Sequence, residues 1–471
     1  MKHTQPHPQP RQLGAFIQSY AGTVQVTGNL HAVDYRRLSI DSRTMLAGDF
    51  FIALKGERFD AHDFLPLVLE KSPAALVINK TGYQRFCRLI QKRAVPTVVV
   101  QNTLHFLQEL SRWHRMQYAI PVVGVTGSSG KTTTREMIAA VLQRRYRVVR
   151  SAKNQNNQIG VPLSLLKIDH QTEVAVLELG TNQPGEIGRL TELVQPTIGV
   201  ITHIGKSHIG FFGSQDAIFR EKTAMFDGMA PGSTIVLNME DPYLRTYQRK
   251  DVQIITVGLQ RGMEVWGRYL EMDALGCVRW RLNDSVDIQL HVPGRHNLLN
   301  AVLASAVGLQ MGLPVVEVQQ ALEAFRPAHQ RMEYFQRDGV LFINDAYNAN
   351  PESMRAALQY ICELAQLSGK RIVVLGDMLE LGAFEVTEHR ALGDVIADLP
   401  IQMVLLYGPL MKHLEARLQE MPEKGIVVRW FEDHVALAEF LKPHLAAGDV
   451  VLVKGSRGMQ MERVLENLTV E

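Results

Sequence analysis

Short apolar runs bounded by turn residues recur along the chain, and segments with helical periodicity separate them. The first two runs are FFIAL at 50–54 and AALVI at 74–78. Runs of this length predict buried strands. The stretch at 1–12, MKHTQPHPQPRQ, is polar and rich in proline instead, so we expect a disordered tail there.

A second group of apolar runs follows. Strands are predicted at 121–127, 174–180, 197–205 and 233–238, with helical stretches between them. This alternation predicts a mostly parallel sheet with helices on both faces. Residues 263–292 alternate apolar and polar positions, which predicts a small antiparallel insertion.

A third group of runs repeats the alternation toward the C-terminus. Its predicted strands are 340–345, 371–377, 402–408, 426–430 and 449–455. They indicate a second, smaller doubly wound α/β domain with a Rossmann-like sheet. The predicted fold is therefore α/β with three domains, at 1–118, 119–328 and 329–471.

Composition supports an ordinary multidomain protein. The chain has 471 residues, which suits about three domains. It carries 50 basic and 48 acidic residues, a balance that argues against a dedicated nucleic-acid binder. Cys87, Cys277 and Cys362 lie far apart without disulfide or metal-ligand spacing, so we expect a reducing, cytoplasmic location. No apolar run approaches the ~20 residues of a membrane helix, so no membrane insertion is expected.

The sharpest local signal is TGSSGKTTT at 126–134, which follows an apolar strand and precedes a helical stretch. Glycine-rich loops in this position turn their backbone N–H groups onto phosphate oxygens. Lys131 can reach the outer phosphates of a nucleotide, and the Thr132 hydroxyl can bind Mg²⁺. Val125 stands where the common GxxxxGK[ST] spacing has its first glycine. The sequence has TGxxGKTT instead, and this variant loop restricts the classes of nucleotide-binding enzyme to which the chain can belong. The predicted ATP-binding residues here are Thr126, Gly127, Ser128, Ser129, Gly130, Lys131, Thr132 and Thr133.

Further motifs follow this loop in the order found in one family. They are NQNNQIGVPLSLL at 154–166, LELGTNQPGEIG at 178–188, HIGFFGS at 208–214, PGRHNLLNAVLA at 293–304, DAYNANPESMRAAL at 345–358, GDMLELG at 376–382 and VKGSRGMQME at 453–462. With DSRTMLAGDFFIALKGERFDAHDF at 41–64, they make the chain resemble the Mur ligases, ATP-dependent amide-forming enzymes of peptidoglycan synthesis. The YNANP and GDMLELG stretches resemble most closely the branch that adds D-alanyl-D-alanine.

The resemblance implies a two-step reaction. ATP phosphorylates the terminal carboxylate of a UDP-N-acetylmuramoyl-tripeptide, and the amine of D-alanyl-D-alanine attacks the acyl phosphate through a tetrahedral intermediate. It also implies Mg²⁺ and a CO₂-derived carbamate on Lys222. The three domains would then bind the UDP-sugar, bind ATP and complete the ligase site, in chain order. We expect a monomer that takes these substrates and binds no nucleic acid.

Four residues carry the chemistry in this resemblance. Glu178 ends an apolar strand, where α/β sheets place ligands, and its carboxylate suits Mg²⁺. His208 is favoured over His203 by its place in the motif. Lys222 matches the family lysine that carries the carbamate. The physical reason for a carbamate is that an amine near metal ions gains by losing its positive charge. The implied catalytic residues are Lys131, Glu178, His208 and Lys222, and the implied metal ligands are Thr132, Glu178, His208 and Lys222.

Motif position also implies the remaining nucleotide contacts. They are His296, Asn297 and Asn300 near the adenine, Arg331 at the phosphates, Asp345 at the ribose, and Tyr347. Asn297 could instead cap a helix. Arg331 could instead pair with Glu333, although a guanidinium suits phosphate well.

The implied substrate contacts fall into two groups. Those for the UDP-sugar are Ser42, Arg43, Asp60 and His62, and those near the incoming dipeptide are Asn348, Asn350, Asp377, Glu380, Lys454, Ser456 and Arg457. An acidic pair and a basic loop suit a zwitterion, whose ammonium and carboxylate need opposite partners. Asp60 could equally cap a short helix.

Other interpretations compete with this one. The ligase that adds the third peptide residue, or folylpolyglutamate synthetase, would share the ATP domain, but YNANP and GDMLELG argue against both. A switch or motor ATPase usually pairs its loop with a strand ending in Asp, whereas this chain offers Glu178. An inactive homologue has no support, because all four catalytic positions are filled. Gly205-Lys206-Ser207 resembles the end of a phosphate loop without its glycine-rich turn, so we interpret Lys206 as a surface or site-rim lysine.

Overall fold

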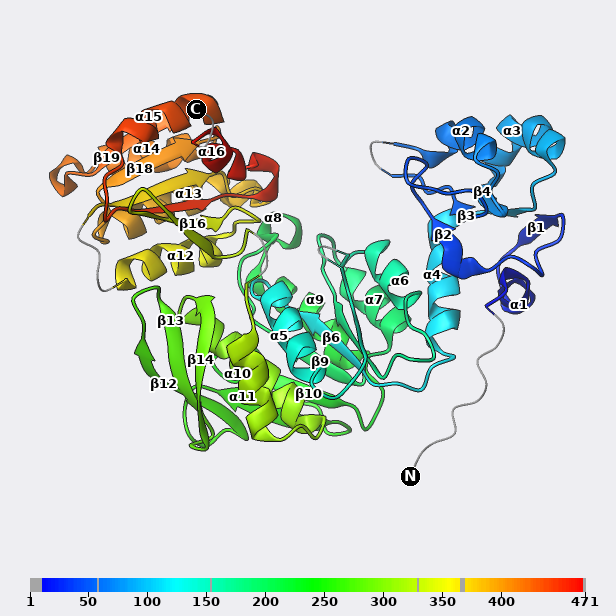
Figure 1. The fold of residues 1–471 in the computed structure, drawn as a ribbon, viewed down its shortest axis with the longest axis horizontal. Coiled ribbons are helices and arrows are strands. Elements are labelled where there is room, and N and C mark those ends of the chain that lie inside the picture. Colours follow the sequence, from blue (N-terminus) through cyan, green and yellow to red (C-terminus); the bar gives the residue numbers. More distant parts are fainter. Residues whose placement is uncertain (1–10, 57–58, 153–154, 328–329, 365–368, 469–471) are drawn as a thin grey trace. The chain divides into compact units, whose positions relative to one another are not determined.

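The computed structural model describes residues 11–56, 59–152, 155–327, 330–364 and 369–468 (Figure 1). The chain forms two compact units, each assembled from separate stretches of sequence. The first comprises the chain up to Val122 together with Arg147–Leu179 and Arg189–Pro196. The second comprises Val123–Tyr146, Gly180–Gly188 and the chain from Thr197 onward. No helix in these described ranges is long and apolar enough to cross a membrane.

The first unit contains a five-stranded sheet in the order β1-β5-β4-β3-β2. Its strands are β1 (Val24–Thr27), β2 (Leu38–Ser39), β3 (Phe50–Ile52), β4 (Ala75–Asn79) and β5 (Thr97–Val100). Strands β2 to β5 pair in parallel, and β1 pairs antiparallel with β5. The apolar runs predicted as strands at 50–54 and 74–78 are present as β3 and β4, and every residue of β3 is buried.

Helices of the first unit complete its core. They are α1 (Leu13–Ser19), η1 (Tyr35–Arg37), η2 (Ala61–Phe64), α2 (Leu65–Glu70), α3 (Lys80–Arg93) and α4 (Thr103–Arg115). Asn102 caps α4, because its Oδ1 accepts hydrogen bonds from the backbone N–H groups of Leu104 and His105. Helix α4 then buries Phe106 and Leu110 in one apolar core with the strands.

The fold begins two residues earlier than the predicted tail allows. Arg11 Nη2 donates to Tyr118 Oη at 2.7 Å, and Gln12 forms an isolated β-bridge with Asp34. The prediction of a disordered tail through Gln12 is therefore wrong for these two residues, because specific polar contacts hold them. Residues 1–10 lie outside the described part of the chain.

Residues 147–179 belong to the first unit and add two strands to it. Strands β7 (Val148–Arg150) and β8 (Val174–Glu178) pair in parallel, with α6 (Gly160–Leu165) between them in sequence. Leu166, just after α6, is buried in the core that α4 also lines. Strand β8 corresponds to the run predicted at 174–180, and all its residues are buried.

The second unit contains a sheet whose strand β6 leads into the phosphate loop. Its strand order there is β14-β13-β12-β11-β10-β9-β6. The strands are β6 (Val122–Thr126), β9 (Ile198–Ile201), β10 (Thr234–Asn238), β11 (Gln253–Gly258), β12 (Val265–Met272), β13 (Cys277–Leu282) and β14 (Val286–Pro293). Neighbours from β6 to β11 pair in parallel, whereas β12, β13 and β14 pair antiparallel. The antiparallel insertion predicted at 263–292 is thereby confirmed.

Helices alternate with these strands along the chain or follow them. They are α5 (Lys131–Leu142), α8 (Ile209–Phe212), α9 (Gln215–Asp227), η3 (Leu244–Thr246), α10 (His296–Gln310) and α11 (Val315–Ala324). Helix α7 (Glu186–Val194) belongs to the second unit up to Gly188 and to the first unit from Arg189. Helix α10 is buried along most of its length and packs on α5, the helix that opens at the phosphate loop.

The last sheet of the second unit has the order β15-β16-β20-β17-β18-β19. Its strands are β15 (Glu333–Arg337), β16 (Val340–Asp345), β17 (Arg371–Gly376), β18 (Met403–Tyr407), β19 (Val427–Phe431) and β20 (Val450–Lys454). All neighbours pair in parallel except β15, which pairs antiparallel with β16. The helices are α12 (Pro351–Glu363), η4 (Gly382–Phe384), α13 (Glu385–Ala397), α14 (Met411–Gln419), η5 (Pro422–Lys424), α15 (His434–Leu441), η6 (Lys442–His444), η7 (Arg457–Met459) and α16 (Glu462–Asn467).

Candidate active site

The phosphate loop connects buried strand β6 to helix α5 and requires glycine at two positions. Gly127 and Gly130 have φ angles of +147° and +76°. A methyl group on Gly127 would overlap the Thr202 hydroxyl, and one on Gly130 would lie 2.8 Å from Asn300 Oδ1. Ser128 N–H donates to His203 O at 2.8 Å, which ties the loop to the segment after β9. The loop is therefore held in an open turn at the start of a helix, the arrangement that binds phosphate.

Two lysines meet at this loop. Lys131 Nζ donates to the carbonyl of Gly127 at 2.7 Å. Lys222, from α9, is only 2% exposed. Burial, reinforced by repulsion from Lys131 and opposed by Glu221, holds the pKa of Lys222 well below its ordinary value. A lowered pKa favours the uncharged amine, which is the form that reacts with CO₂.

The protein side chains do not form a complete magnesium site by themselves in the described ranges. Thr132 is buried in the first turn of α5. Within the described ranges, no three His, Cys, Asp or Glu side chains converge closely enough to hold a metal ion. Mg²⁺ commonly takes one or two protein ligands, with phosphate oxygens and water supplying the rest. A cation held mainly by a nucleotide therefore fits these residues.

Glu178 ends β8 in the first unit and is 2% exposed. Its Oε1 accepts from Asn156 Nδ2 at 2.9 Å, and its backbone N–H donates to Ser151 Oγ at 3.1 Å. Asn156 lies in the NQNNQ motif, so two of the predicted motifs meet at this carboxylate.

His208 is paired with a residue of another predicted motif. Its Nδ1 lies 2.6 Å from Glu380 Oε2. Both residues have left-handed backbone angles, with φ of 58° and 66°. Hydrogen bonding to His208 lowers the pKa of Glu380 despite partial burial of the carboxylate. The structure thus brings one predicted metal ligand against one predicted dipeptide residue.

The predicted adenine residues form a hydrogen-bonded series that begins at α5. Thr134 Oγ1 donates to Asn300 Oδ1 at 3.1 Å, and Asn300 Nδ2 donates to Asn297 Oδ1 at 2.9 Å. Asn297 Nδ2 donates in turn to Pro293 O at 2.7 Å. Asn297 therefore braces α10 from within the helix and does not occupy its N-cap position, which is Arg295. His296 is exposed at the same helix start.

Asp345 and Lys454 lie side by side at the carboxyl ends of neighbouring strands β16 and β20. Lys454 Nζ lies 2.5 Å from Asp345 Oδ2 and also donates to Asn348 O at 3.0 Å. Arg457 N–H reaches Asn348 Oδ1 at 3.4 Å. The YNANP and KGSRG motifs, about a hundred residues apart in sequence, therefore share one edge of this sheet.

The start of α12 reaches the phosphate loop. Asn350 caps α12 in a capping box with Ser353, and its Nδ2 lies 3.5 Å from Ser128 O. The guanidinium of Arg331 lies 3.8 Å from the centre of the Tyr347 ring. The predicted alternative partner of Arg331, Glu333, accepts a hydrogen bond from Gln330 N–H. Asn350 therefore both caps α12 and contacts the phosphate loop.

The side chains of Asp377 and Ser456 are buried and accept hydrogen bonds from backbone N–H groups. Asp377 is 1% exposed, and its carboxylate accepts from the N–H groups of Leu410 and Met411 at the start of α14. Burial raises the pKa of Asp377, although these two hydrogen bonds oppose the shift. Ser456 Oγ accepts from Leu379 N–H at 2.9 Å. Arg457, by contrast, is exposed.

The four predicted UDP-sugar residues lie in the first unit. Ser42 and Arg43 offer their carbonyl oxygens to Lys71 Nζ, and the Arg43 guanidinium is exposed in an ion pair with Asp41. Asp60 caps η2 and lies 2.5 Å from His62 Nδ1, so the predicted capping role is present. His62 is buried, and its Nε2 accepts from Asn79 N–H. Arg43 is thus the most accessible of the four.

Comparisons with known proteins bear on the family. Three family models match successive parts of the chain: Mur ligase family, catalytic domain (34–115), Mur ligase middle domain (125–308) and Mur ligase, glutamate ligase domain (330–457). The UDP-N-acetylmuramoyl-tripeptide–D-alanyl-D-alanine ligase of Bacillus subtilis is 34% identical over 92% of each chain. The chain belongs to the Mur ligase family.

Solved structures extend this similarity to three dimensions. A crystal structure of MurF from Acinetobacter baumannii aligns with this Mur ligase at a TM-score of 0.85 and 30% identity, covering 98% of this chain and 99% of that one. MurF ligase from Thermotoga maritima, crystallised in complex with ADP, aligns at a TM-score of 0.79 and 27% identity over 92% and 97% of the two chains. These matches support ATP binding by this Mur ligase.

Sequence reasoning missed two side-chain pairs beside the phosphate loop of this Mur ligase. His203 Nδ1 lies 2.8 Å from Asp241 Oδ2. Hydrogen bonds from His203, Ile204 and Leu244 outweigh the effect of burial and lower the pKa of Asp241. Lys206, interpreted from sequence as a surface or rim lysine, is partly exposed, and its Nζ lies 2.6 Å from Glu388 Oε1. No local signal reveals these pairs, because their members are far apart in sequence.

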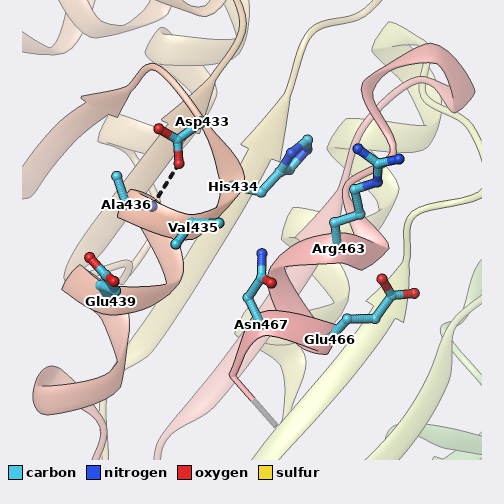
Figure 2. Close-up of a pocket in the computed structure, with 8 residues that line it drawn as sticks. All are labelled: Asp433, His434, Val435, Ala436, Glu439, Arg463, Glu466 and Asn467. Atoms are coloured by element: carbon cyan, nitrogen blue, oxygen red, sulfur yellow. Dashed lines mark hydrogen bonds between the residues drawn. The ribbon is translucent and has the colours of Figure 1, made fainter. Parts of the chain in front are cut away.

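One groove on the surface of the second unit is separate from these residues. A groove of about 660 Å³ lies between α15 and α16 (Figure 2). Asp433 and His434 open α15 on one side, and Arg463, Glu466 and Asn467 line the α16 side (Figure 2). None of its lining residues is a predicted site residue, so this Mur ligase does not place its expected chemistry there.

Proposed function

We propose that this Mur ligase uses ATP to join the terminal carboxylate of UDP-N-acetylmuramoyl-tripeptide to the amine of D-alanyl-D-alanine. The products are the UDP-linked pentapeptide precursor of peptidoglycan, ADP and phosphate. One observation carries the proposal: residues of the YNANP motif contact the phosphate loop, through Asn350 and Ser128, in a chain similar over its full length to enzymes named for this reaction. The alternatives are the ligase that adds the third peptide residue and a related amide ligase such as folylpolyglutamate synthetase.

The residues of the loop support the phosphoryl-transfer step. The N–H groups from Gly127 to Thr133 and the N-terminus of α5 would hold the phosphates. Lys131 would exchange its contact with Gly127 O for the outer phosphates, where its charge offsets the developing negative charge. Arg331 would leave the Tyr347 ring for the same phosphates, and Asp345 would accept from the ribose.

We further propose a magnesium site that involves Thr132, Glu178, His208 and carbamylated Lys222. When bound, the cation neutralises phosphate and acyl-phosphate charge. The lowered pKa of the buried Lys222 amine favours its uncharged form and so supports carbamate formation, and buried Glu178 supplies a carboxylate. His208 Nδ1 lies 2.6 Å from Glu380 Oε2, so the His208 ring would have to turn away from Glu380 to bind a cation through Nδ1.

The dipeptide would bind where the C-terminal strands end. Arg457 is exposed and suits the carboxylate of the dipeptide, while Glu380 suits its ammonium group. Asp377, Lys454 and Ser456 would support these residues from within the fold, and Asn348 and Asn350 would border the attacking amine. Arg43, with Ser42 and the Asp60–His62 pair, remains the proposed UDP-sugar site. The proposed division of labour follows the predicted domains 1–118, 119–328 and 329–471.

The test is ADP release with UDP-N-acetylmuramoyl-tripeptide in the presence and absence of D-alanyl-D-alanine, with the product identified by mass. The proposal requires ADP only when both are present, and a product that carries the added dipeptide. ADP release with a single amino acid would favour the other ligases. ADP release without any amine would favour an ATPase that works by conformational change.

A further inference from the structure

The loop between β9 and α8, residues 202–208, contacts the phosphate loop at its first half. The Ser128 hydroxyl donates to Gly205 O at 3.0 Å and accepts from Gly205 N–H at 2.8 Å. Ser128 N–H also donates to His203 O. Two hydrogen bonds thus join the Ser128 hydroxyl to the backbone of Gly205. Because of them, we expect Gly205 to move together with Ser128.

The second half of the same loop contacts two helices near the YNANP and GDMLELG motifs. Lys206 N–H donates to Glu352 Oε1 on α12 at 2.7 Å, and Lys206 Nζ donates to Glu388 Oε1 on α13 at 2.6 Å. One residue therefore holds both helices, and it follows directly the residue that is bonded to Ser128.

Because Glu388 is buried, the Lys206–Glu388 pair stabilises the present positions of α12 and α13. The Glu388 side chain is 4% exposed, and its other cationic neighbour, Arg355, lies 3.4 Å from Oε2. A buried carboxylate that loses a charged partner is costly to the protein. Since Lys206 is on the nucleotide-binding side and Glu388 on the C-terminal side, the pair stabilises the seated position of α12 and α13.

Gly205 leaves no space for a looser contact. A methyl group there would lie 2.8 Å from the Glu352 carboxyl carbon and 3.0 Å from His203 Nε2. The phosphate loop, Gly205 and the α12 carboxylate are thus in continuous contact. Lys206 itself turns its Nζ toward Glu388, whereas Lys131 lies over the phosphate loop.

We propose that Lys206 is a positioning residue that couples occupancy of the phosphate loop to the seating of α12 and α13. It acts through Gly205 and Ser128 on one side and through Glu352 and Glu388 on the other. The proposal deepens the proposed function and rests on it, because amide formation needs residues from both sides at once. Ser128 moves with bound phosphate, and Lys206 carries that movement to the helices that bear Asn350 and border Glu380.

The first experiment compares Lys206→Met with Lys206→Arg by steady-state kinetics and by ADP titration. In Lys206→Met we expect kcat to fall about tenfold, and the Kd of ADP to rise by the factor by which ADP slows exchange of the two helices in wild type, because coupling is reciprocal. Lys206→Arg should recover most of kcat, since a guanidinium can replace the ammonium. Lys424→Met, which removes an exposed lysine paired with Asp398, is the matched control and should behave as wild type. A kcat and a Kd of ADP that both match wild type would overturn the proposal.

A double-mutant cycle tests the partner directly. Lys206→Met with Glu388→Gln should be no worse than Lys206→Met alone, because the neutral amide no longer needs a cation. Independent, multiplicative losses would count against coupling through this pair. Thermal unfolding of each variant separates loss of fold from loss of coupling.

The second experiment does not depend on the ligase reaction. Hydrogen–deuterium exchange of 351–363 and 385–397 is measured with and without ADP. We expect ADP to slow exchange of both helices in wild type and not in Lys206→Met. Equal slowing in both proteins would sink the proposal. If wild type shows this slowing yet ligates no dipeptide, the proposed function fails while the role of Lys206 stands.

Discussion

The Tyr35 hydroxyl lies 2.8 Å from His114 Nδ1 in the core of the first unit. The opposite ring nitrogen, Nε2, lies 2.8 Å from Ile168 O. A carbonyl can only accept, so Nε2 carries a proton, and in the neutral imidazole Nδ1 accepts from the tyrosine hydroxyl. Both ring nitrogens of the neutral form therefore have partners.

This pairing predicts acid sensitivity of the first unit. Burial lowers the pKa of His114 to about 4 in the folded state, against about 6.5 when unfolded. The unfolded chain therefore binds a proton first, and stability present above pH 6.5 is lost as pH falls toward 4. The expected loss is about 3 kcal/mol, measured by urea unfolding at several pH values. His114→Gln should flatten this dependence, whereas His105→Gln, at an exposed position of the same helix, should retain it.

Replacing Lys222 should remove the response to CO₂. We expect Lys222→Ala to lower kcat about 100-fold, a loss of roughly 3 kcal/mol in transition-state stabilisation. Wild type assayed in CO₂-depleted buffer should regain activity when bicarbonate is added, because the lowered pKa of its buried amine favours the uncharged form that reacts with CO₂. Arg220→Ala, at an exposed position of α9, is the control. A bicarbonate response that persists in Lys222→Ala would place the carbamate elsewhere.

A methyl group at Gly127 should weaken nucleotide binding. The added carbon would overlap Thr202 Oγ1, and φ at this position is +147°. Overpacking of this kind costs about 1–3 kcal/mol, so the affinity for ADP measured by calorimetry should fall about 10–100-fold. Gly188→Ala is the matched control, because nothing lies within 4 Å of its added carbon and it sits in helix α7. Equal affinities in the two variants would contradict the steric argument.

Removing the Asp377 carboxylate should cost stability more than substrate affinity. The N–H groups of Leu410 and Met411 would lose their acceptor inside the fold, which costs about 1–3 kcal/mol. We expect Asp377→Ala to lower the thermal midpoint and Asp377→Asn to recover part of it. The KM for D-alanyl-D-alanine should change little in Asp377→Asn. A large rise in that KM with an unchanged midpoint would return Asp377 to direct substrate contact.

Local patterns were sufficient to predict most of the fold. The apolar runs at 74–78 and 174–180 correspond to β4 and β8, and the alternating stretch at 263–292 forms antiparallel strands. Strand β15 was missed because Glu333–Arg337 reads EYFQR, and its last three residues are exposed. An edge strand that buries little apolar surface leaves little hydrophobic pattern to detect.

The candidate site was predictable in its residues but not in their pairings. Motifs located His208 and Glu380, yet only the folded chain brings their side chains within 2.6 Å. The sequence predicts Lys206 as a surface or rim lysine because no glycine-rich turn precedes it, and its partner Glu388 lies 182 residues away. Pairings of this kind depend on tertiary structure, since each partner taken alone is an ordinary polar residue.

The composite make-up of the first unit affects how the chain folds during synthesis. Its core includes Leu166, which follows α6, and its last stretch ends at Pro196. A ribosome must therefore translate about forty percent of the message before every piece of this unit has emerged. In the meantime the nascent N-terminal sheet exposes the apolar surface that Leu166 will cover. Because such surface favours aggregation, the early chain gains from rapid elongation through 147–196 or from a chaperone that covers it.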